Sequence, residues 1–296
     1  MLSILIPIYN FDIRPLVDAL RRQAQELEIA WEICCIDDGS DHAWQALNRE
    51  LASWPGVRYR EQSENLGRAR IRNVLAEAAH GEYLLFMDCD SMPPDEAFLQ
   101  RYAALLQPDT LLYGGRAYQP SPPQDPALYF HWRYGSQREV AAAAVRQRAP
   151  YRSFMTNNFL VPKTVFQRIR FDGRLRRYGH EDTLFGLELE ARGVPIVHLD
   201  NPLLHIGLEP AGVFLAKTRQ GIQNLAFLEK SRSQRIDTRL LQAYRTLRRY
   251  RAAVPICWFL RPLRPLLERQ LLSARPSLRL FDWYKLSCLL EELGCC

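Results

Sequence analysis

The chain has 296 residues, 47% of them apolar and 24% charged, with a net charge of +6, which suits a globular protein with one substantial core. Its longest apolar runs, such as 252–260, are far too short to span a bilayer, and no basic region or cleavage site of a signal peptide follows Met1. We therefore expect a cytoplasmic protein without a transmembrane anchor.

Short apolar runs alternate with longer amphipathic segments over the first two thirds of the chain, which is typical of a mostly parallel sheet flanked by helices. The expected strands are 3–8, 31–36, 57–60, 83–87 and 111–114. The expected helices between them are 15–28, 43–51, 67–79 and 95–106. Ligands of such sheets bind beyond the carboxyl ends of the strands, so the residues that follow each strand are candidate site residues.

Prolines and helical spacing organise the rest of the chain. A proline-rich connector at 119–126 precedes an expected helix at 127–146, and an apolar strand at 158–161 precedes a helix that opens near Glu181. From Pro210, leucines and arginines recur at helical spacing up to Tyr250. Beyond Pro255, prolines at 262, 265 and 276 predict a series of short helices.

Charge and cysteines add two expectations. Residues 217–285 hold 16 Lys and Arg against four acids, a balance of +12, whereas residues 1–216 carry −4. The seven cysteines show neither CxxC pairs nor zinc-ligand spacing, so we expect reduced thiols, most of them buried. Cys295 and Cys296 are expected to be exposed at the terminus.

Three polar clusters follow expected strands. They are Pro7-Ile8-Tyr9-Asn10, Asp37-Asp38-Gly39-Ser40 and Asp88-Cys89-Asp90. Taken singly, each is an ordinary strand-exit turn, because Asp, Gly and Ser favour turns and helix caps. Together they predict one polar site at one edge of the sheet.

In this order and spacing, the clusters resemble the family 2 glycosyltransferases, whose nucleotide-sugar-binding fold is called GT-A. The resemblance runs from about residue 3 to 205 and rests on the segments 4–10, 35–40, 65–73, 81–90 and Tyr178-Gly179-His180-Glu181-Asp182. It implies an α/β GT-A catalytic domain at 1–209, with a donor half at about 1–114 and an acceptor half at about 115–209. Residues 210–296 would form a basic helical extension.

The clusters also have a physical interpretation as a donor site. A nucleoside diphosphate repels bare carboxylates, so Asp88 and Asp90 imply a divalent cation, Mn²⁺ or Mg²⁺, that assists departure of the diphosphate. Tyr9 offers a flat face for the base, and Asp37 or Asp38 can accept hydrogen bonds from base or ribose.

Further donor contacts are expected from neighbouring residues of the same motifs. Arg68, Arg70 and Arg72 begin a helix, where guanidinium and amide groups suit phosphates, and Arg70 is the first choice among them. The expected donor-binding set is completed by Pro7, Asn10, Gly67 and Cys89.

An acid pair opens the helix after Gly179. The dipole of this helix favours the charged form of a carboxylate at its N-terminus. The resemblance implies that Asp182 is the general base, and Glu181 is the next candidate. His205, followed by Gly207, is a candidate third metal ligand, whereas His198 within an apolar run is expected to be structural.

Other functional classes fit less well. A dinucleotide-dependent oxidoreductase would need a Gly-x-Gly-x-x-Gly turn after the first strand, and a nucleotidyltransferase would need a glycine-rich basic loop there. A processive membrane polymerase of the same family would carry transmembrane helices and a Gln-x-x-Arg-Trp motif. A sugar-nucleotide-binding protein without turnover is the alternative that stays open.

We therefore expect an inverting transferase that moves a sugar from a nucleotide sugar, with uridine diphosphate favoured, to a glycan or lipid-linked hydroxyl. The basic segment 217–285 either docks on an anionic membrane surface or packs on the catalytic body, and these two alternatives are equally supported. Nucleic acid is not an expected partner, because no recognition module is visible.

Overall fold

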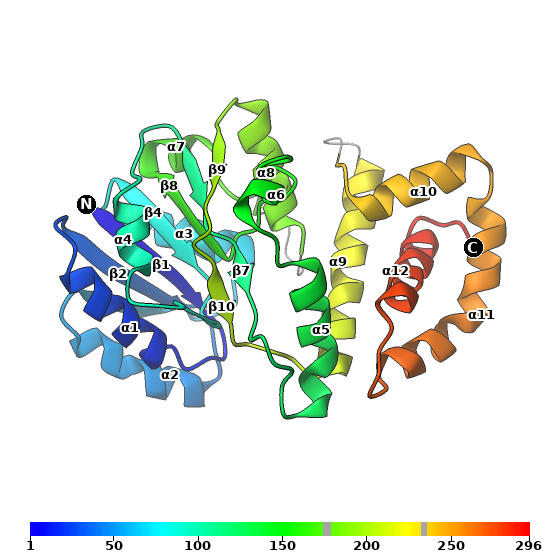
Figure 1. Cartoon of the computed structure of the whole chain (residues 1–296), viewed down its shortest axis with the longest axis horizontal. Helices are drawn as coiled ribbons and strands as arrows, with labels where there is room; N and C mark the ends of the chain where they lie inside the picture. Colours follow the sequence, from blue (N-terminus) through cyan, green and yellow to red (C-terminus); the bar gives the residue numbers. More distant parts are fainter. Residues whose placement is uncertain (174–178, 232–235) are drawn as a thin grey trace. The chain divides into compact units, whose positions relative to one another are not determined.

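The computed structural model describes residues 1–173, 179–231 and 236–296 and divides into two compact units (Figure 1). Unit 1 comprises Met1–Tyr118, Val140–Arg176 and Glu181–Gly207. Unit 2 comprises Gln119–Glu139, Arg177–His180 and Leu208–Cys296. Within the described ranges, no helix is long and apolar enough to cross a bilayer.

Unit 1 is built around a seven-stranded sheet in the order β3-β2-β1-β4-β8-β6-β9. All neighbouring strands are parallel except β8, which runs antiparallel to β4 and β6. The strands are β1 (Leu2–Ile8), β2 (Trp31–Asp37), β3 (Val57–Glu61), β4 (Tyr83–Met87), β6 (Leu111–Tyr113), β8 (Asn158–Pro162) and β9 (Ile196–His198). A second sheet joins β5 (Ser91–Met92), β10 (Leu203–His205) and β7 (Arg116–Ala117) in that order.

The central strands are apolar on both faces, which explains why they form the middle of a covered sheet. In β1, Leu5 belongs to one buried cluster, whereas Ile4 and Ile6 belong to the cluster on the opposite face. Helices α1 (Arg14–Gln25) and α4 (Phe98–Ala103) contribute to the Ile4 face, together with the 3₁₀ turn η1 (Arg49–Ser53). Helices α3 (Arg68–Ala78), α7 (Lys163–Arg168) and α8 (Glu181–Ala191) cover the Leu5 face.

Two shorter helices complete unit 1. Helix α2 (His42–Asn48) follows β2, and its Asn48 side chain bonds the backbone of Phe11 and Ile13 before α1. Helix α6 (Ala143–Arg146) places the buried guanidinium of Arg146 against the carbonyls of Gly114 and Leu199. These bonds fix the loops that enter and leave the strands.

Unit 2 is helical, and helix α12 (Leu278–Glu292) forms its centre. Apolar residues of α12 such as Phe281 and Leu289 are fully buried, and the helix packs against α9 (Ala211–Ser231), α10 (Arg239–Arg249) and α11 (Ala253–Leu271). The 3₁₀ turn η2 (Pro126–Leu128) leads into α5 (Tyr129–Arg138), which packs on α9. The ring of Phe130 contacts both Phe214 and Phe281.

The structure corrects two predictions about helices. The expected helix at 127–146 is broken into η2, α5 and the separate α6. The expected short helices after Pro255 are wrong, because α11 continues through Pro262 and Pro265. Both prolines lie on the exposed side of α11, where water can satisfy the carbonyl oxygens that lose their helical partners.

The prediction of seven reduced cysteines is also wrong. Cys257 of α11 and Cys296 at the terminus form a disulfide that closes a loop of 39 residues. Nothing in their spacing indicates the bond, because only the packing of α11 against α12 brings the two residues together. The remaining cysteines are free, and three of them, Cys34, Cys35 and Cys288, are buried as expected.

Candidate active site

The three polar clusters lie at neighbouring strand ends. Strand β1 is paired with β2 on one side and with β4 on the other, and Ile8 is in register with Asp37. The backbone N–H of Asp38 donates to the carbonyl of Ile8 at 2.8 Å. The residues that follow β1, β2 and β4 therefore share the carboxyl edge of the sheet, which is where ligands of this architecture bind.

Asn10 fastens the loop after β1 to the loop after β2. Its backbone N–H donates to Ser40 Oγ at 2.8 Å, and its side-chain carbonyl accepts from the backbone of Asp41 at 2.8 Å. Asn10 adopts a positive φ of 49°, a conformation that Asn tolerates better than most residues. Pro7 precedes this loop within β1, and the Tyr9 side chain beside it is 53% exposed and available for stacking.

Asp37 and Asp38 have different surroundings. Asp38 accepts hydrogen bonds from the backbone N–H groups of Leu66 at 2.7 Å and Gly67 at 3.0 Å, so it shapes the turn before α3, and burial raises its pKa. Asp37 accepts from the backbone of Ser40 at 2.7 Å through Oδ1. Its buried Oδ2 has no hydrogen-bond partner among the described residues, so it could accept from a ligand.

Gly39 permits the turn between these acids and α3. Its φ is +72°, and a Cβ atom there would lie 2.8 Å from the backbone nitrogen of Asn65. Glycine is therefore required where the two loops approach.

Three arginines surround Asp88. Arg72 is only 1% exposed, and its Nη2 lies 2.6 Å from Asp88 Oδ1. Arg116 of β7 and Arg68 approach Oδ2 at 3.1 and 3.6 Å. The structure does not bring Arg70 to this cluster, because its Nε donates to the carbonyl of Gly173 at 3.2 Å.

Arg68 links this cluster to the acid pair of α8. Its Nε lies 2.5 Å from Glu181 Oε1. Burial alone would raise the pKa of Glu181, but the charges of Arg68 and Arg72 lower it below its ordinary value. Burial and the charge of Glu181 raise the pKa of Asp182 to about 6.

Asp90 and His205 form a second pair beside Asp88. Asp90 Oδ1 lies 3.5 Å from Nδ1 of the buried His205, and this oxygen is buried without a hydrogen bond to the described residues. Although burial opposes the charged form, His205, Arg116 and Arg68 lower the pKa of Asp90. Strand β10 brings His205 beside Ser91 of β5, two strands that pair antiparallel.

Gly207 allows this close approach. A Cβ atom at residue 207 would lie 2.5 Å from the Cβ of Asp90, and the backbone N–H of Gly207 donates to the Asp90 carbonyl at 3.2 Å. Any side chain at this position would push Asp90 away from β10.

The residues present fit a divalent cation as a partly open site. Among the described residues, no group of three or more His, Cys, Asp or Glu side chains is arranged to hold a metal. Mg²⁺ and Mn²⁺ are commonly held by few protein ligands, together with substrate phosphates and water. The shielded oxygen of Asp90 and the adjacent imidazole of His205 supply two ligands of the right chemistry.

Burial also determines the protonation of Cys89 and His198. Burial and the neighbouring Asp90 raise the pKa of Cys89 to about 12, so its thiol stays protonated. Burial lowers the pKa of His198 to about 4, and its Nε2 lies 3.0 Å from the carbonyl oxygen of Pro150, as expected for a structural histidine.

Sequence reasoning missed Arg116, which follows β6 in a segment without a motif, and ranked Arg70 above Arg68 and Arg72. The buried neighbours of Asp88 could not be ranked from spacing, because three arginines at alternate positions point in different directions around a helix. Tyr178, the first residue of the predicted base motif, lies outside the described residues.

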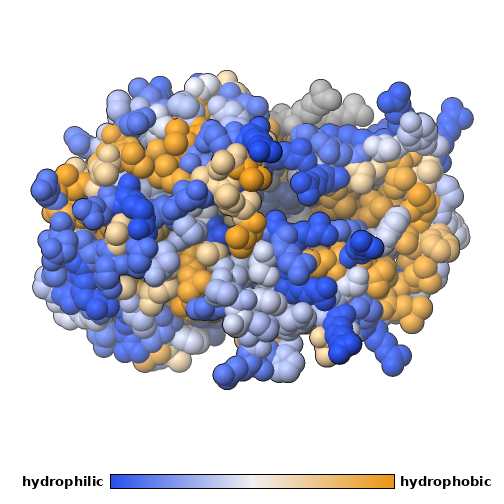
Figure 2. Space-filling model, viewed as in Figure 1, coloured by the Kyte–Doolittle hydropathy of each residue, from blue (hydrophilic) through white to orange (hydrophobic). Residues whose placement is uncertain are grey.

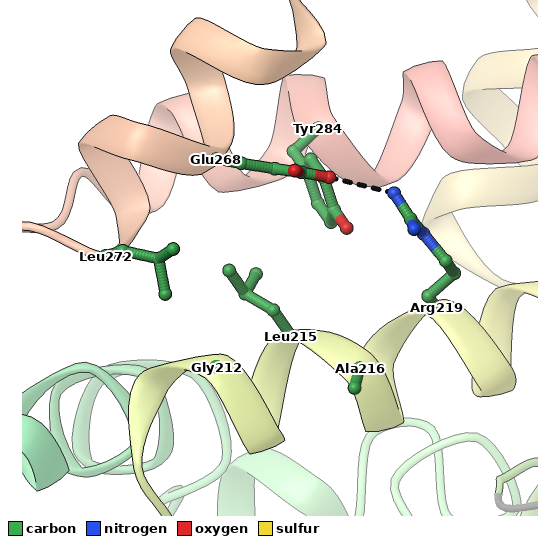
Figure 3. Close-up of a pocket in the computed structure, with 7 residues that line it drawn as sticks. All are labelled: Gly212, Leu215, Ala216, Arg219, Glu268, Leu272 and Tyr284. Carbon is green, nitrogen blue, oxygen red and sulfur yellow. Dashed lines mark hydrogen bonds and ion pairs between the residues drawn. The ribbon is translucent and has the colours of Figure 1, made fainter.

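The cavity in Figure 3 belongs to unit 2 and holds no arrangement of acids for this chemistry. It measures about 200 Å³ and is lined by Gly212, Leu215, Ala216, Arg219, Glu268, Leu272 and Tyr284. Its two charged groups pair with each other across the cavity, with Arg219 Nη2 at 2.8 Å from Glu268 Oε1 (Figure 3). The carboxylates at the sheet edge are therefore the stronger candidate site.

A family model and two curated relatives all point to the same family of proteins. The family model described as "Glycosyl transferase family 2" matches residues 3–168, which is more than half of the chain. The poly(ribitol-phosphate) beta-glucosyltransferase of Bacillus spizizenii is 36% identical over 105 residues, which are 34% of this chain and only 16% of that protein. Glycosyltransferase GlyG of Streptococcus pneumoniae is 24% identical over 216 residues, covering 69% of this chain and 70% of that protein.

A solved structure supports the fold independently. The mannosyltransferase PcManGT from Pyrobaculum calidifontis, in complex with GDP-Man and Mn²⁺, superposes with a TM-score of 0.59 at 15% identity. The match covers 99% of this chain and 85% of that one. The GT-A fold expected from the sequence is thereby confirmed, with its mostly parallel sheet flanked by helices.

Proposed function

Because the chain belongs to glycosyl transferase family 2 and is a glycosyltransferase, we propose that it transfers a sugar from a nucleoside diphosphate sugar with inversion at the anomeric carbon. The acceptor is a hydroxyl group of a glycan or of a lipid-linked glycan. The observation that carries the proposal is one cluster of charged side chains, in which Arg68 joins Asp88 to the Glu181-Asp182 pair of α8. Asp90 lies beside His205 in the loop that follows the same strand as Asp88.

Asp182 is the general base in this proposal. It takes the proton of the acceptor hydroxyl while the acceptor oxygen forms a bond to the anomeric carbon. The bond from that carbon to the diphosphate breaks on the opposite face, so the electron pair leaves with the nucleoside diphosphate and the configuration inverts. A pKa of about 6 leaves Asp182 mostly ionised at neutral pH and still able to accept a proton.

The arginines complement the negative charge of the donor. Arg68 and Arg116 are partly exposed beside Asp88, so their positive charge lies where the diphosphate would bind. Tyr9, Asn10 and the free oxygen of Asp37 would receive the nucleoside, with Pro7, Asp38, Gly67 and Cys89 shaping the loops around it. Arg70 is also included in this proposed donor-binding set, although its Nε donates to the Gly173 carbonyl.

The implied cation is Mn²⁺ or Mg²⁺, which Asp90 and His205 would hold together with Asp88, the carboxylate that also faces three arginines. The cation supplies Lewis-acid neutralisation of the departing diphosphate. The neighbour with GDP-Man and Mn²⁺ supports this assignment by similarity of fold. Uridine diphosphate is the nucleotide that the resemblance to the family favours.

The proposed catalytic domain is 1–209, with the donor bound mainly by its first half, and 210–296 is a helical extension. An acceptor carried on a lipid would be met at the inner face of the cytoplasmic membrane, so peripheral association belongs to this proposal. No contact with nucleic acid is part of it.

The test is a panel of uridine and guanosine diphosphate sugars, scored by the nucleoside diphosphate released with Mn²⁺, Mg²⁺ or chelator. We expect metal-dependent release from at least one donor, and calorimetric binding of the matching diphosphate only with metal. His205→Asn should abolish the metal dependence of binding, whereas the exposed His42→Asn should preserve it. Equal binding with metal and with chelator would contradict the metal assignment.

A further inference from the structure

Helix α11 presents an apolar face to solvent, which is unusual for a surface helix. Val254, Trp258, Phe259 and Leu266 are each more than half exposed, with Trp258 and Phe259 at 68%. By helical spacing they share one side of α11 with the exposed Pro255, Pro262 and Pro265. The opposite side, with Cys257 and Leu260, is buried in unit 2. Figure 2 shows hydrophobic side chains gathered at the right-hand edge, where Figure 1 draws α11.

The exposed aromatic side chains of this face do not contribute to the packing of unit 2. The side chains that stabilise α11 point toward α12, whereas two large aromatic rings point away from it into water. Exposing contiguous apolar area of this kind is unfavourable in a soluble monomer and marks an interaction site.

Exposed arginines lie on α11 and in the segments that precede and follow it. Arg248, Arg249 and Arg251 precede α11 and are exposed, Arg261 and Arg269 lie on its exposed side, and Arg275 and Arg279 follow it. Over 239–271 the chain holds eight arginines and one acid, Glu268, which is already paired with Arg219. Of the seven exposed arginines that precede, belong to or follow α11, only Arg261 has an ion pair within the described ranges, at 4.0 Å from Glu291. The rim is therefore cationic and available.

The chemistry of the rim selects the partner. A second copy of this chain would bring two arginine rims together, and their repulsion opposes such a dimer. An anionic bilayer instead offers phosphates to the arginines and an apolar boundary to the aromatic rings, which favour the headgroup region. We propose that the exposed face of α11 docks the enzyme on an anionic lipid surface, with Trp258 and Phe259 inserted among the headgroups and Arg248, Arg249 and Arg251 on lipid phosphates.

This proposal deepens the acceptor side of the proposed function and names the face that meets the lipid. It predicts that the +12 balance of 217–285 acts through one helix face rather than through net charge alone. Vesicle binding is measured without donor and donor hydrolysis without vesicles, so failure of either result leaves the other interpretable.

The test uses the full chain and sedimentation with vesicles of phosphatidylcholine alone or with roughly 30% phosphatidylglycerol. We expect binding only to the anionic vesicles, weakened at high salt. The double variant Trp258→Gln/Phe259→Gln should bind about tenfold less or weaker still, and the triple variant Arg248→Gln/Arg249→Gln/Arg251→Gln should lose the preference for anionic lipid. All these side chains are exposed, so thermal melting and nucleotide binding should stay unchanged.

Two matched controls separate the face from general effects. Phe227→Gln removes an aromatic ring that is 60% exposed on α9, and Arg22→Gln/Arg168→Gln/Arg170→Gln removes three exposed charges from unit 1. Both should bind vesicles like the unmodified chain. The proposal is overturned if the unmodified chain stays in the supernatant at low salt, or if the controls lose as much binding as the α11 variants. Self-association that the Trp258→Gln/Phe259→Gln variant dissolves would equally overturn it in favour of a dimer interface.

Discussion

Glu181 and Asp182 are adjacent carboxylates in opposite electrostatic environments. Glu181 is ion-paired with Arg68 at 2.5 Å, which lowers its pKa and makes it a weak base. Asp182 accepts a hydrogen bond from the backbone of Thr183 at 2.7 Å, yet burial and the charge of Glu181 raise its pKa to about 6. In the proposed mechanism Glu181 therefore positions Arg68, and Asp182 transfers the proton.

Replacing Asp182 by Asn should lower turnover by about a hundredfold or more, because a general base typically contributes that much. The shape of the side chain is preserved, so the affinity for the nucleoside diphosphate should stay within about twofold. Steady-state rates and calorimetry measure the two effects. The exposed Asp109→Asn serves as the isosteric control, and near-normal turnover of Asp182→Asn would place the base elsewhere.

The raised pKa of Asp182 predicts the pH dependence of turnover. A base works only when deprotonated, so kcat should be flat above its pKa of about 6 and fall about tenfold per pH unit below it. A pH–rate profile at saturating donor measures this. A profile that stays level between about pH 5 and 8 would count against Asp182 as the base.

Asp88 also has a role in stability. Asp88→Asn would leave the buried Arg72 guanidinium without its charged partner at 2.6 Å, and breaking such a pair costs about 3 kcal/mol in the free energy of unfolding. Urea denaturation should show this loss without any ligand. Asp18→Asn, which removes a surface pair with Arg21 and Arg22 at 3.5 Å, should cost less than about 1 kcal/mol. Equal losses for the two variants would mean that Asp88 is not essential to the core.

At the scale of elements, the apolar strands of the donor half were predictable to within a residue or two. Strands β1, β2 and β4 are apolar on both faces, so their runs end abruptly in polar residues that mark the carboxyl edge. The candidate site follows from the same signal, because β2 and β4 both run parallel to β1 between them, so Asp37 and Asp88 lie at the same edge of the sheet. No comparable signal exists for Arg116, whose position depends on the small sheet of β5, β10 and β7.

Helix α11 shows why local rules failed in unit 2. Pro262 and Pro265 each remove one helical hydrogen bond, and the rule that prolines end helices assumes that the loss is not compensated. Here Cys257, Leu260 and Leu271 pack the inner face and hold the helix together. Tertiary packing of this kind, like the disulfide to Cys296, has no signature in the local sequence.

Gly207 lies where the end of β10 meets the loop that holds Asp90, and a substitution there tests the importance of this contact. In Gly207→Ala the added methyl group would lie 2.5 Å from Asp90 Cβ, so either Asp90 or the end of β10 must move. We expect metal-dependent binding of the nucleoside diphosphate to weaken about tenfold or more, as measured by calorimetry with Mn²⁺. Gly212→Ala, where a Cβ atom meets nothing within 4 Å, should leave binding unchanged. Unaltered affinity in Gly207→Ala would show that the site tolerates this movement.

For the molecule as a whole, the order of the strands in the large sheet differs from their order along the chain. The first four strands to be synthesised form one side of the sheet in the order β3-β2-β1-β4. The neighbour of β4 on the other side is β8, more than 70 residues later, with Phe86 opposite Phe159. Strands β6 and β9 join only beyond β8, so the predicted donor and acceptor halves share one uninterrupted sheet.

This strand order has a consequence during biosynthesis. While the ribosome makes residues 88–157, the fully apolar edge of β4 has no strand to pair with, which is a template for aggregation. The fragment 1–114, which ends after β6 and lacks β8, should therefore be insoluble or bound by chaperones, whereas the fragment 1–209, which adds β8 and β9, should be soluble. Centrifugation of both fragments after cell-free translation measures the difference. A soluble, monomeric 1–114 would show that the nascent chain protects this edge before β8 emerges.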